Sequence, residues 1–405
     1  MKILILAGSG RSLVNFRGPL IEALVREGHE VVAAAPLEAG FGPAQAAALG
    51  ARFEPLQFAR AGLNPLSDFL SMRRMDALFR RERPDILLAS TIKPVVYGTV
   101  SARKAGVPRI FALVTGLGAA FHSSGWRGRA LAFVAARLYR RALRRCTGVM
   151  VQNRDIAEHF RRRGIAAESL RLIVVAGSGV DLVHFAARPF PSGAEPCFLL
   201  LGRLLKDKGI CEYVEAAREV RREFPAAQFL LAGDFDPNPA AISREQLEDW
   251  KKEGVIEYHP FAPDVRPLLE RCSVFVLPSY HEGMPRSVLE AMATGRGIVT
   301  TDTIGCRDTV FGVDPVRKNS SLFQTGENGL LVPVRSSGAL AAAMKHLARH
   351  PATAAAMGQR GRELAEQCFD VRKVNAMMLD FMGLKTETDR AARNAPNRPV
   401  TPEMT

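Results

Sequence analysis

Short apolar runs alternate with longer amphipathic stretches along this chain, and the alternation starts afresh near the middle. The stretches Pro19–Arg26 and Phe69–Arg83 have helical spacing of their apolar residues. Such alternation is typical of strand–helix–strand units on a parallel sheet. The strands predicted in the first half are Ile3–Ala7, Val31–Ala35, Ile86–Ala89, Ile110–Val114 and Val149–Val151.

The alternation resumes after Arg188–Pro196, a segment rich in Pro and Gly that has the composition of a linker. Helices are predicted from about Gly209 and over Ala339–His350 and Thr353–Phe369. The predicted strands are Phe198–Leu201, Phe229–Ala232, Val274–Leu277, Ile298–Thr300 and Leu330–Val332. A chain of 405 residues is too long for one ordinary core. The sequence therefore predicts an α/β fold of two doubly wound, Rossmann-like domains, with ligands in the cleft between them, beyond the carboxyl ends of the strands.

The excess of positive over negative residues lies entirely in the first half of the chain. Residues 1–188 contain 28 Lys and Arg against 13 Asp and Glu, whereas the remainder contains 27 against 28. This asymmetry indicates an anionic partner for the first half: a nucleic acid, acidic lipid headgroups or a phosphorylated substrate. The alternative is a solubilising, Arg-rich surface.

The compartment is indicated by cysteine usage and hydropathy. The six cysteines are scattered without a C-x-x-C pair, which argues against a zinc site and a disulfide scaffold and fits a reducing cytosol. No run of about 18 apolar residues is present, so no membrane-spanning helix is expected. The apolar opening Lys2–Ala7 is too short for a signal peptide and is interpreted as a buried strand.

A basic amphipathic stretch, Trp126–Arg145, lies within the positive half, and Arg161–Arg163 extends its charge. Its arginines alternate with apolar residues such as Phe133, Val134 and Leu138, a pattern that suits an anionic membrane surface. Two alternatives remain. The apolar residues can simply pack on their own core, or the arginines can bind nucleic-acid phosphates, although no nucleic-acid motif is evident.

The segment Glu282–Glu290 reads Glu-Gly-Met-Pro-Arg-Ser-Val-Leu-Glu and follows the predicted strand Val274–Leu277. This order indicates a strand, a glycine-bearing loop and the start of a helix. A helix N-terminus presents unpaired N–H groups and partial positive charge, which favour a phosphate. The two carboxylates that bracket this position are better suited to accept hydrogen bonds from sugar hydroxyls. The segment therefore predicts a nucleotide-sugar site.

Two cations follow the first strand of the second half. Arg203, after Gly202, and Lys208 would suit a departing diphosphate, whose developing charge fixed cations stabilise. By themselves two such residues are more often surface residues. Together with the Glu282–Glu290 segment they predict a diphosphate site.

Gly8-Ser9-Gly10 follows the first strand and would allow a ligand to approach the backbone. A dinucleotide-binding fingerprint would require a glycine at position 13, which is Leu13, so a nicotinamide-dependent dehydrogenase is disfavoured. The alternative interpretation is a tight turn between strand and helix.

Asp234 and Asp236 resemble the Asp-x-Asp of metal-dependent sugar-nucleotide enzymes. The favoured interpretation is a loop entering a helix, with Asp serving as a cap. His122 and His281 are either site residues or solvated loop residues, and the latter is favoured for each.

In combination, Glu282-x7-Glu290, Gly202-Arg203 with Lys208 and the two Rossmann-like halves resemble the retaining glycosyltransferases of family 4, which have the GT-B fold. Further strings are similar to bacterial enzymes that extend undecaprenyl-diphosphate-linked sugars, among them those acting on lipid-linked diacetylbacillosamine. These strings lie at Asn15–Arg17, Thr91–Gly98, Val114–Gly118 and Thr301–Asp308.

The resemblance implies a UDP-sugar donor and a polyprenyl-diphosphate-linked acceptor. It assigns Arg203 and Lys208 to the donor diphosphate, Glu290 to the ribose hydroxyls, and Glu282 to the transferred sugar. Many family members carry a donor-contacting His at the end of the fifth strand; here Val114–Gly118 stands there, and His122, a few residues later, is the candidate substitute. The expected catalytic residues are Arg203, Lys208, Glu282 and His122. The expected donor-binding residues are Gly8, Ser9, Gly10, Gly202, Gly283, Met284, Pro285, Arg286 and Glu290. The expected acceptor and membrane residues are Arg17, Lys93, Arg140, Arg141, Arg144 and Arg145.

The implied domain plan has four parts. Residues 1–187 form the acceptor-binding domain, 188–368 the nucleotide-sugar domain, 369–384 a helix crossing back to the first domain, and 385–405 a disordered tail. No cofactor or metal is expected, because protein cations replace the metal in this fold. The departing phosphate serves as base while the acceptor attacks the same face of the sugar.

The implied location is cytoplasmic, peripheral on the inner face of the cell membrane. The implied partner there is the anionic bilayer surface, and no nucleic-acid partner is expected. The implied role is the assembly of cell-surface polysaccharides or glycoprotein glycans. Two alternatives are a UDP-sugar 2-epimerase of the same fold and a non-catalytic basic protein that binds membranes.

Overall fold

The computed structural model describes residues 1–58, 65–116, 125–191, 195–236, 238, 240–260, 262, 264–314 and 322–384. Contacts divide the chain into two units. The first contains Met1–Val151, Ala157–Val175 and the chain from Val374 onward, and the second contains Gln152–Ile156 and Ala176–Lys373. Residues 176–187, which precede the predicted linker, thus pack with the second unit.

The described residues of the first unit form a seven-stranded sheet of order β3-β2-β1-β4-β5-β6-β7, and all of its pairings are parallel. The reversal of strand order at β1 and β4 is the mark of a doubly wound sheet. The strands are β1 Lys2–Leu6, β2 Glu30–Ala35, β3 Arg52–Pro55, β4 Ile86–Ser90, β5 Arg109–Val114, β6 Gly148–Val151 and β7 Leu172–Val174.

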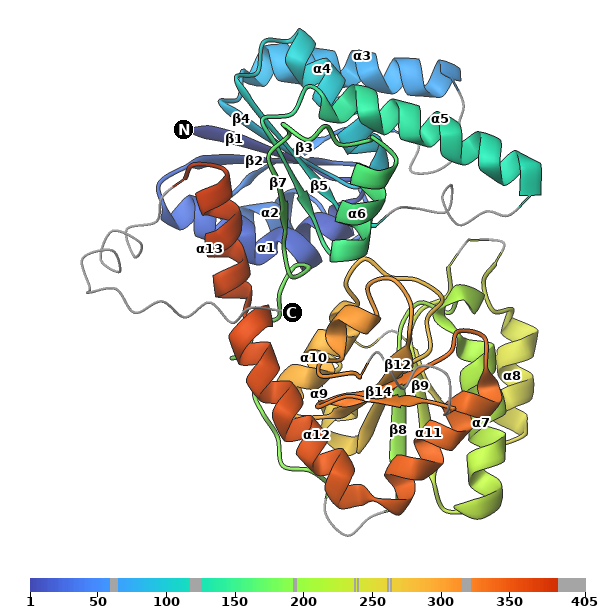
Figure 1. Ribbon diagram of the computed structural model, residues 1–405. Coiled ribbons are helices and arrows are strands. Elements are labelled where there is room, and N and C mark those ends of the chain that lie inside the picture. The colour runs from blue at the N-terminus through green and yellow to red at the C-terminus, as the bar shows by residue number, and fades with distance from the viewer. Residues whose placement is uncertain are drawn as a thin grey trace. The chain divides into compact units, whose positions relative to one another are not determined.

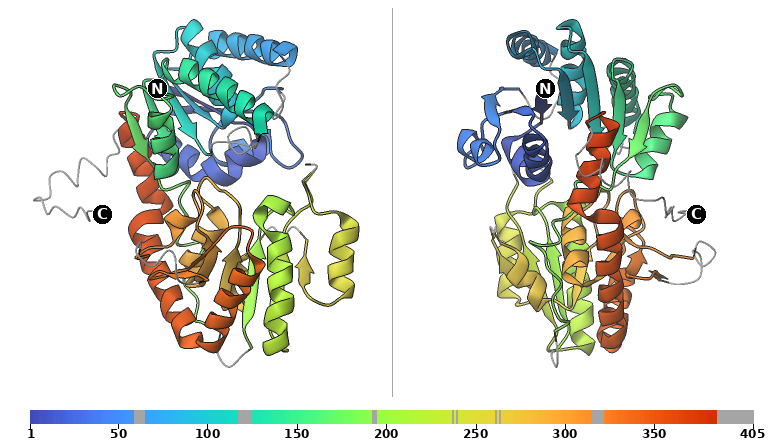
Figure 2. Two further views of the ribbon diagram at one scale, coloured as in Figure 1. Left: turned by 45° about the vertical axis from the view of Figure 1, so that its right-hand side comes forward. Right: turned by 90° about the vertical axis from the view of Figure 1, so that its left-hand side faces the viewer.

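Helices α1 and α2 cover one face of this sheet, and α3, α4 and α5 cover the other (Figure 1). A π-helical turn, Pro94–Gly98, precedes α4, and both contact α3 and α5, so that they lie between these two helices (Figure 2). The helices are α1 Gly10–Arg26, α2 Pro43–Ala48, α3 Pro65–Glu82, α4 Thr99–Lys104, α5 Gly125–Leu143 and α6 Arg154–Arg162.

Helix α1 is nine residues longer at its start than predicted. The side chain of Ser9 accepts a hydrogen bond from the Ser12 N–H at 3.0 Å and so caps the helix. Pro19, the first residue of the amphipathic stretch, lies inside the helix. The cap therefore sets the start of this helix, and the proline does not.

The second unit contains a sheet of order β10-β9-β8-β11-β12-β14-β13, in which only the β13–β14 pairing of the described residues is antiparallel. The strands are β8 Cys197–Leu201, β9 Gln228–Ala232, β10 Glu257–His259, β11 Val274–Leu277, β12 Gly297–Thr301, β13 Gln324–Thr325 and β14 Gly329–Val332. The helices are α7 Ile210–Glu223, α8 Arg244–Lys252, α9 Arg266–Arg271, α10 Arg286–Thr294, α11 Ser337–Arg349 and α12 Pro351–Leu364.

The core of the second unit occupies both faces of its sheet. Along β8, Phe198 and Leu200 belong to one buried cluster, whereas Leu199 and Leu201 belong to the other. Successive side chains of a strand point to opposite faces, so a strand buried on both sides is a continuous apolar run. This explains why such runs predicted the strands well.

The last helix, α13 (Val371–Phe381), ends in the first unit. The ring of Phe381 packs edge-on against Phe111, with 5.9 Å between ring centroids, and lies under the guanidinium of Arg171 at 4.8 Å. Arg109 donates to the carbonyl of Met382 at 3.2 Å. These contacts anchor the described end of the chain to the first sheet.

Candidate active site

The predicted donor residues lie in loops that follow neighbouring parallel strands of the second sheet. Gly202 and Arg203 follow β8, Glu282 follows β11, and the loop at 302–306 follows β12. The carboxyl ends of parallel strands meet at one edge of a sheet, where ligands of doubly wound folds bind. The fold thus brings these residues to a common edge.

The loops after β8 and β11 are joined by hydrogen bonds. The carbonyl of Asp207 accepts from the Tyr280 N–H at 2.8 Å and from the hydroxyl of Ser279 at 3.1 Å. Gly209 has a positive φ of 72° and lies so close to the Pro278 carbonyl that a side chain there would overlap it. This close approach brings Lys208 to Glu282.

Lys208 and Glu282 form an ion pair through Nζ and Oε1. Both side chains are largely buried, and Glu282 also accepts a hydrogen bond from Ser279 Oγ at 2.9 Å. An ion pair removed from water is held more rigidly than a surface pair. Two of the predicted catalytic residues are therefore placed against each other.

Arg203 is held differently. Its guanidinium pairs with Asp236 at 2.6 Å, and its side chain is 60% exposed. Asp236 also accepts from the Asn238 N–H at 2.9 Å, and Ser243 caps the next helix, α8, by accepting from Gln246. The interpretation of Asp236 as a helix cap was wrong: it is the carboxylate partner of Arg203.

Helix α10 starts at Arg286, after Pro285, without a side-chain cap. Glu290 lies one turn further on, 2.9 Å from Nε of Arg286. Burial raises the pKa of the Glu290 carboxyl, and the nearby Arg286 opposes that rise. The helix start offers N–H groups for an anion, while Glu290 offers an acceptor below them.

The loop that carries Glu282 rests on two neighbouring segments. The Glu282 N–H donates to Ile304 at 3.0 Å, and Gly305, with φ at 77°, packs directly against the carbonyls of Glu282 and Gly283. The Gly283 carbonyl also accepts from Asn153 Nδ2 at 2.5 Å. Sequence reasoning missed Asn153; its one signal was its place between a strand and a helix start.

Close packing explains why glycine is needed at two positions after β1. A side chain at Gly8 would approach Thr91 Oγ1 to 2.6 Å, and one at Gly10 would approach the Phe41 carbonyl to 2.5 Å. Ser9 is buried and caps α1. The tight-turn interpretation accounts for these contacts, and a donor-binding role for Gly8, Ser9 and Gly10 stays a prediction.

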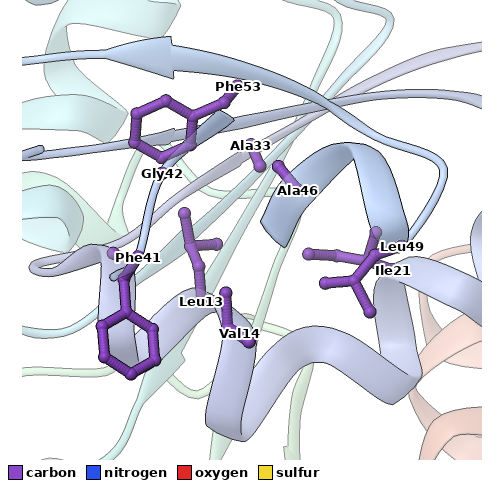
Figure 3. Close-up of a pocket in the computed structure, with 10 residues that line it drawn as sticks. Leu13, Val14, Ile21, Ala33, Phe41, Gly42, Ala46, Leu49 and Phe53 are labelled. Atoms are coloured by element: carbon purple, nitrogen blue, oxygen red, sulfur yellow. The ribbon is translucent and has the colours of Figure 1, made fainter. Parts of the chain in front are cut away.

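A small cavity lies beside Gly10, between α1 and α2 (Figure 3). Its volume is about 10 Å³, and side chains such as Leu13, Ile21, Leu49 and Phe53 line it. A space of this size holds about one water molecule, and an apolar lining keeps it dry. It is a packing defect of the first unit and not a sugar pocket.

Two residues assigned to the acceptor and membrane side are buried. Arg17 is 3% exposed, and Lys93 pairs with Asp68 at 2.7 Å inside the first unit. The hydroxyl of Tyr97 donates to the other oxygen of Asp68 at 2.8 Å. Arg17 and Lys93 therefore do not lie on an outer surface, and the charge of Lys93 is paired inside the unit.

The four arginines predicted to contact the membrane lie in the last turn of α5 and just after it, and they are of two kinds. Arg140 donates to the carbonyls of Gly164 and Arg163 at 2.7 and 2.8 Å, which ties α5 to the end of α6, and Arg145 donates to Arg141 at 2.7 Å. The side chains of Arg141 and Arg144 are exposed. Of the four arginines predicted to contact the membrane, only Arg141 and Arg144 are exposed.

His122 falls outside the described residues, so its role stays a prediction. Among the residues that the structure does describe, no His, Cys, Asp and Glu side chains gather into a group that could hold a metal ion. Within the same ranges, no helix combines the length and apolar content needed to cross a bilayer.

Comparison with known families gives a consistent result for both halves. A family model described as "Glycosyl transferase 4-like domain" matches residues 16–176, and one described as "Glycosyl transferases group 1" matches residues 195–350. The two matches fall in the first and second units respectively.

Two curated relatives act on lipid-linked sugars. The Campylobacter jejuni N,N'-diacetylbacillosaminyl-diphospho-undecaprenol alpha-1,3-N-acetylgalactosaminyltransferase is 30% identical over 326 residues, covering 76% of this chain and 83% of that enzyme. The Escherichia coli UDP-Gal:alpha-D-GlcNAc-diphosphoundecaprenol alpha-1,3-galactosyltransferase is 24% identical, covering 59% of this chain and 63% of that enzyme.

Solved structures resemble the whole fold. Anabaena HepE, in complex with UDP and glucose, superposes with a TM-score of 0.74 at 18% identity, covering 95% of this chain and 99% of HepE. The sucrose-phosphate synthase of Thermosynechococcus elongatus gives a TM-score of 0.73 at 19% identity, covering 98% and 100%. The predicted α/β architecture of two Rossmann-like domains is confirmed.

Proposed function

Since this chain belongs to the group 1 glycosyltransferases and has their GT-B fold, we propose that it moves a hexose or N-acetylhexosamine from a UDP-sugar to a polyprenyl-diphosphate-linked saccharide. The observation that carries this proposal is the common sheet edge at which Lys208, Glu282, Arg203 and Glu290 lie. The two lipid-linked sugar transferases among its relatives support the class of acceptor.

In the proposed mechanism, cations of the second unit stabilise the departing UDP. Arg203 exchanges its contact with Asp236 for the donor diphosphate, since a surface ion pair costs little to break. Lys208 adds a second positive charge from its position against Glu282. Once Arg203 has made this exchange on donor binding, charge that develops on the leaving diphosphate is stabilised without further reorganisation.

The carboxylates hold the sugars. Glu290 accepts hydrogen bonds from the ribose, and Glu282 accepts from the transferred sugar while the N–H groups at the start of α10 face the phosphates. The acceptor hydroxyl attacks the face from which the diphosphate leaves, and the departing phosphate takes its proton. Retention of configuration then requires no nucleophile from the protein.

An anionic bilayer is the proposed partner of the first unit. Trp126, Phe133 and Val134 are 70%, 68% and 45% exposed on α5, beside the exposed Arg137 and Arg141. Apolar side chains next to arginines on one helix suit the boundary between headgroups and acyl chains.

Helix α3, in the same layer, repeats this composition (Figure 1). Leu66, Phe69 and Leu70 are 70%, 54% and 47% exposed, and the Arg73 guanidinium lies 5.8 Å from the Phe69 ring. We call these exposed residues of α3 and α5 the apolar–basic face. Its place in the first unit supports an enzyme that works on the inner face of the cell membrane.

The decisive experiment is a screen of UDP-sugars with a polyprenyl-diphosphate-linked acceptor, with products read by mass. The expected product is the acceptor enlarged by one hexose or N-acetylhexosamine, together with UDP. Conversion of the UDP-sugar to its 2-epimer, detected by NMR because epimers share one mass, with an unchanged acceptor would favour the epimerase. Vesicle binding without turnover of any donor would favour the non-catalytic protein.

A further inference from the structure

Asn153 uses both polar atoms of a buried side chain, one within the segment 152–156 and the other toward Gly283, and both of these segments belong to the second unit. It lies between β6 and α6 and is 1% exposed. Its Oδ1 accepts from the Ile156 N–H at 2.8 Å, which caps α6, and its Nδ2 donates to the Gly283 carbonyl at 2.5 Å. Because Oδ1 receives an N–H, the amide orientation is fixed by its partners.

The bond to Gly283 fixes more than one atom. A trans peptide is planar, so the carbonyl of Gly283 and the N–H of Met284 point in opposite directions. Holding the carbonyl therefore aims the Met284 N–H. That N–H lies two residues before α10, whose first turn has no side-chain cap.

The same short segment touches the donor edge at a second point. Asp155, two residues after Asn153, lies 3.5 Å from the guanidinium of Arg307, which is also 2.9 Å from Asp302. Asp302 and Arg307 flank Gly305, the residue on which the Glu282–Gly283 carbonyls rest. Two contacts thus hold residues 152–156 against the loops that follow β11 and β12.

We propose that Asn153 is a positioning residue of the donor site. It fixes the Gly283–Met284 peptide and, through it, the N–H groups that face the donor phosphate and sugar. The catalytic consequence rests on the proposed function, whereas the effect on the loop itself does not.

The chain allows the two bonds of Asn153 to be separated. Asn153→Ser and Asn153→Asp keep an oxygen that caps α6, because Ser and Asp are good N-caps. The ionised Asp has no donor for the Gly283 carbonyl, and the Ser hydroxyl stands one bond further from that carbonyl than Nδ2 of Asn153 does. Asn153→Ala removes both bonds. Ser243→Ala is the matched control, since it removes the cap of α8 without touching the donor loop.

Two measurements test the proposal: hydrogen exchange of the amides of Gly283, Met284, Arg286 and Ser287, and kcat and KM for the UDP-sugar. Asn153→Ser should speed exchange in this loop and lower kcat/KM by roughly fivefold to tenfold, the equivalent of about one buried hydrogen bond. Its thermal midpoint should fall by about as much as that of Ser243→Ala, since each variant loses one hydrogen bond. Ser243→Ala should lower the midpoint and leave loop exchange and kcat/KM unchanged.

Wild-type loop exchange and wild-type kcat/KM in Asn153→Ser would overturn the proposal and leave the cap as the only role of this residue. If the wild-type protein turned over no UDP-sugar, the proposed function would fail, yet faster loop exchange in Asn153→Ser would still establish the positioning of the loop.

Discussion

Arg203 and Lys208 were predicted as a pair, but the protein holds them in different ways. Lys208 is largely buried against Glu282, whereas Arg203 is 60% exposed beside Asp236. Their partners differ in function too, because Glu282 is itself an expected sugar ligand. Substitution of Lys208 would leave Glu282 unpaired and mix two effects. Arg203 is therefore the cleaner test of the diphosphate site.

Arg203→Ala should lower turnover by roughly two to three orders of magnitude, the usual effect of losing one charge-stabilising donor in a transition state. Turnover with saturating UDP-sugar and acceptor is the measurement. Arg266→Ala is the control, since Arg266 is another exposed arginine of the second unit, paired with Asp264 at 2.7 Å. A wild-type rate in Arg203→Ala would mean that the diphosphate binds elsewhere.

Glu290 predicts a pH dependence of donor binding. Burial raises the pKa of its carboxyl above the ordinary value of 4.5, and sugar hydroxyls donate best to the ionised form. UDP affinity, measured by calorimetry, should therefore weaken as the pH falls through this raised pKa. Glu290→Gln should bind UDP more weakly with no such slope. An equal slope in both proteins would exclude Glu290 as the titrating group.

The same shift has a consequence for stability. A raised folded-state pKa means that the folded protein binds this proton more tightly than the unfolded chain. The contribution of Glu290 to the free energy of unfolding is therefore largest at low pH and is lost as the pH rises through the folded pKa. Relative to the wild type, Glu290→Gln should gain stability over that rise.

At the scale of elements, the sequence predicted best the strands that are covered on both faces of their sheet. The runs at β1, β2, β4, β5, β8, β9, β11, β12 and β14 were located to within about a residue, because continuous apolar runs identify central parallel strands. The strands β3, β7 and β10 are three or four residues long with partly exposed side chains, so they carry no such signal.

The site was predictable only in part, and for a related reason. Lys208, Glu282 and Glu290 lie in recognisable sequence motifs, and the structure brings Lys208 and Glu282 together. Asn153 is a single polar residue 130 positions away from the loop that it contacts. A contact of that separation depends on the fold, and no local pattern encodes it.

The apolar–basic face yields a prediction at the scale of two helices. Arg137→Gln with Arg141→Gln should weaken binding to anionic vesicles by about tenfold to thirtyfold, given roughly 1 kcal/mol for each arginine near the surface. Raised salt should have a similar effect. Sedimentation with vesicles of mixed anionic and neutral lipid is the measurement.

Trp126→Ser with Phe133→Ser tests the apolar part of this face, and vesicle binding should fall without a change in thermal stability because both side chains are exposed. Leu322→Ser is the control, as Leu322 is 62% exposed in the second unit. Undiminished binding of both double variants would remove the bilayer as the partner of this face.

At the scale of the whole molecule, the end of the described chain stabilises its beginning. Phe381 is 7% exposed and packs on Phe111 of β5. Phe381→Ala should lower the stability of the first unit by about 3–5 kcal/mol, as is usual for a buried phenylalanine. Native-state hydrogen exchange of the first-sheet amides measures this unit by itself.

Met377→Ala is the matched control for this substitution. Met377 lies on the same helix and is 49% exposed, so its loss should change the stability by less than about 0.5 kcal/mol. Equal effects of the two substitutions would mean that α13 contributes through its presence alone and not through the Phe381 contact.

The assignment of residues 152–156 to the second unit bears on how such enzymes can be recombined. A chimera that joins the first half of one relative to the second half of another at the linker 188–196 would be expected to take its donor specificity from the second half. Yet the amide that holds the Gly283 carbonyl would then come from one parent and the loop from the other. If the proposed donor site is right, a hybrid enzyme should keep its donor preference only when the short stretch around Asn153 is inherited together with the loop, so that part of this site would be encoded in the first half of the gene.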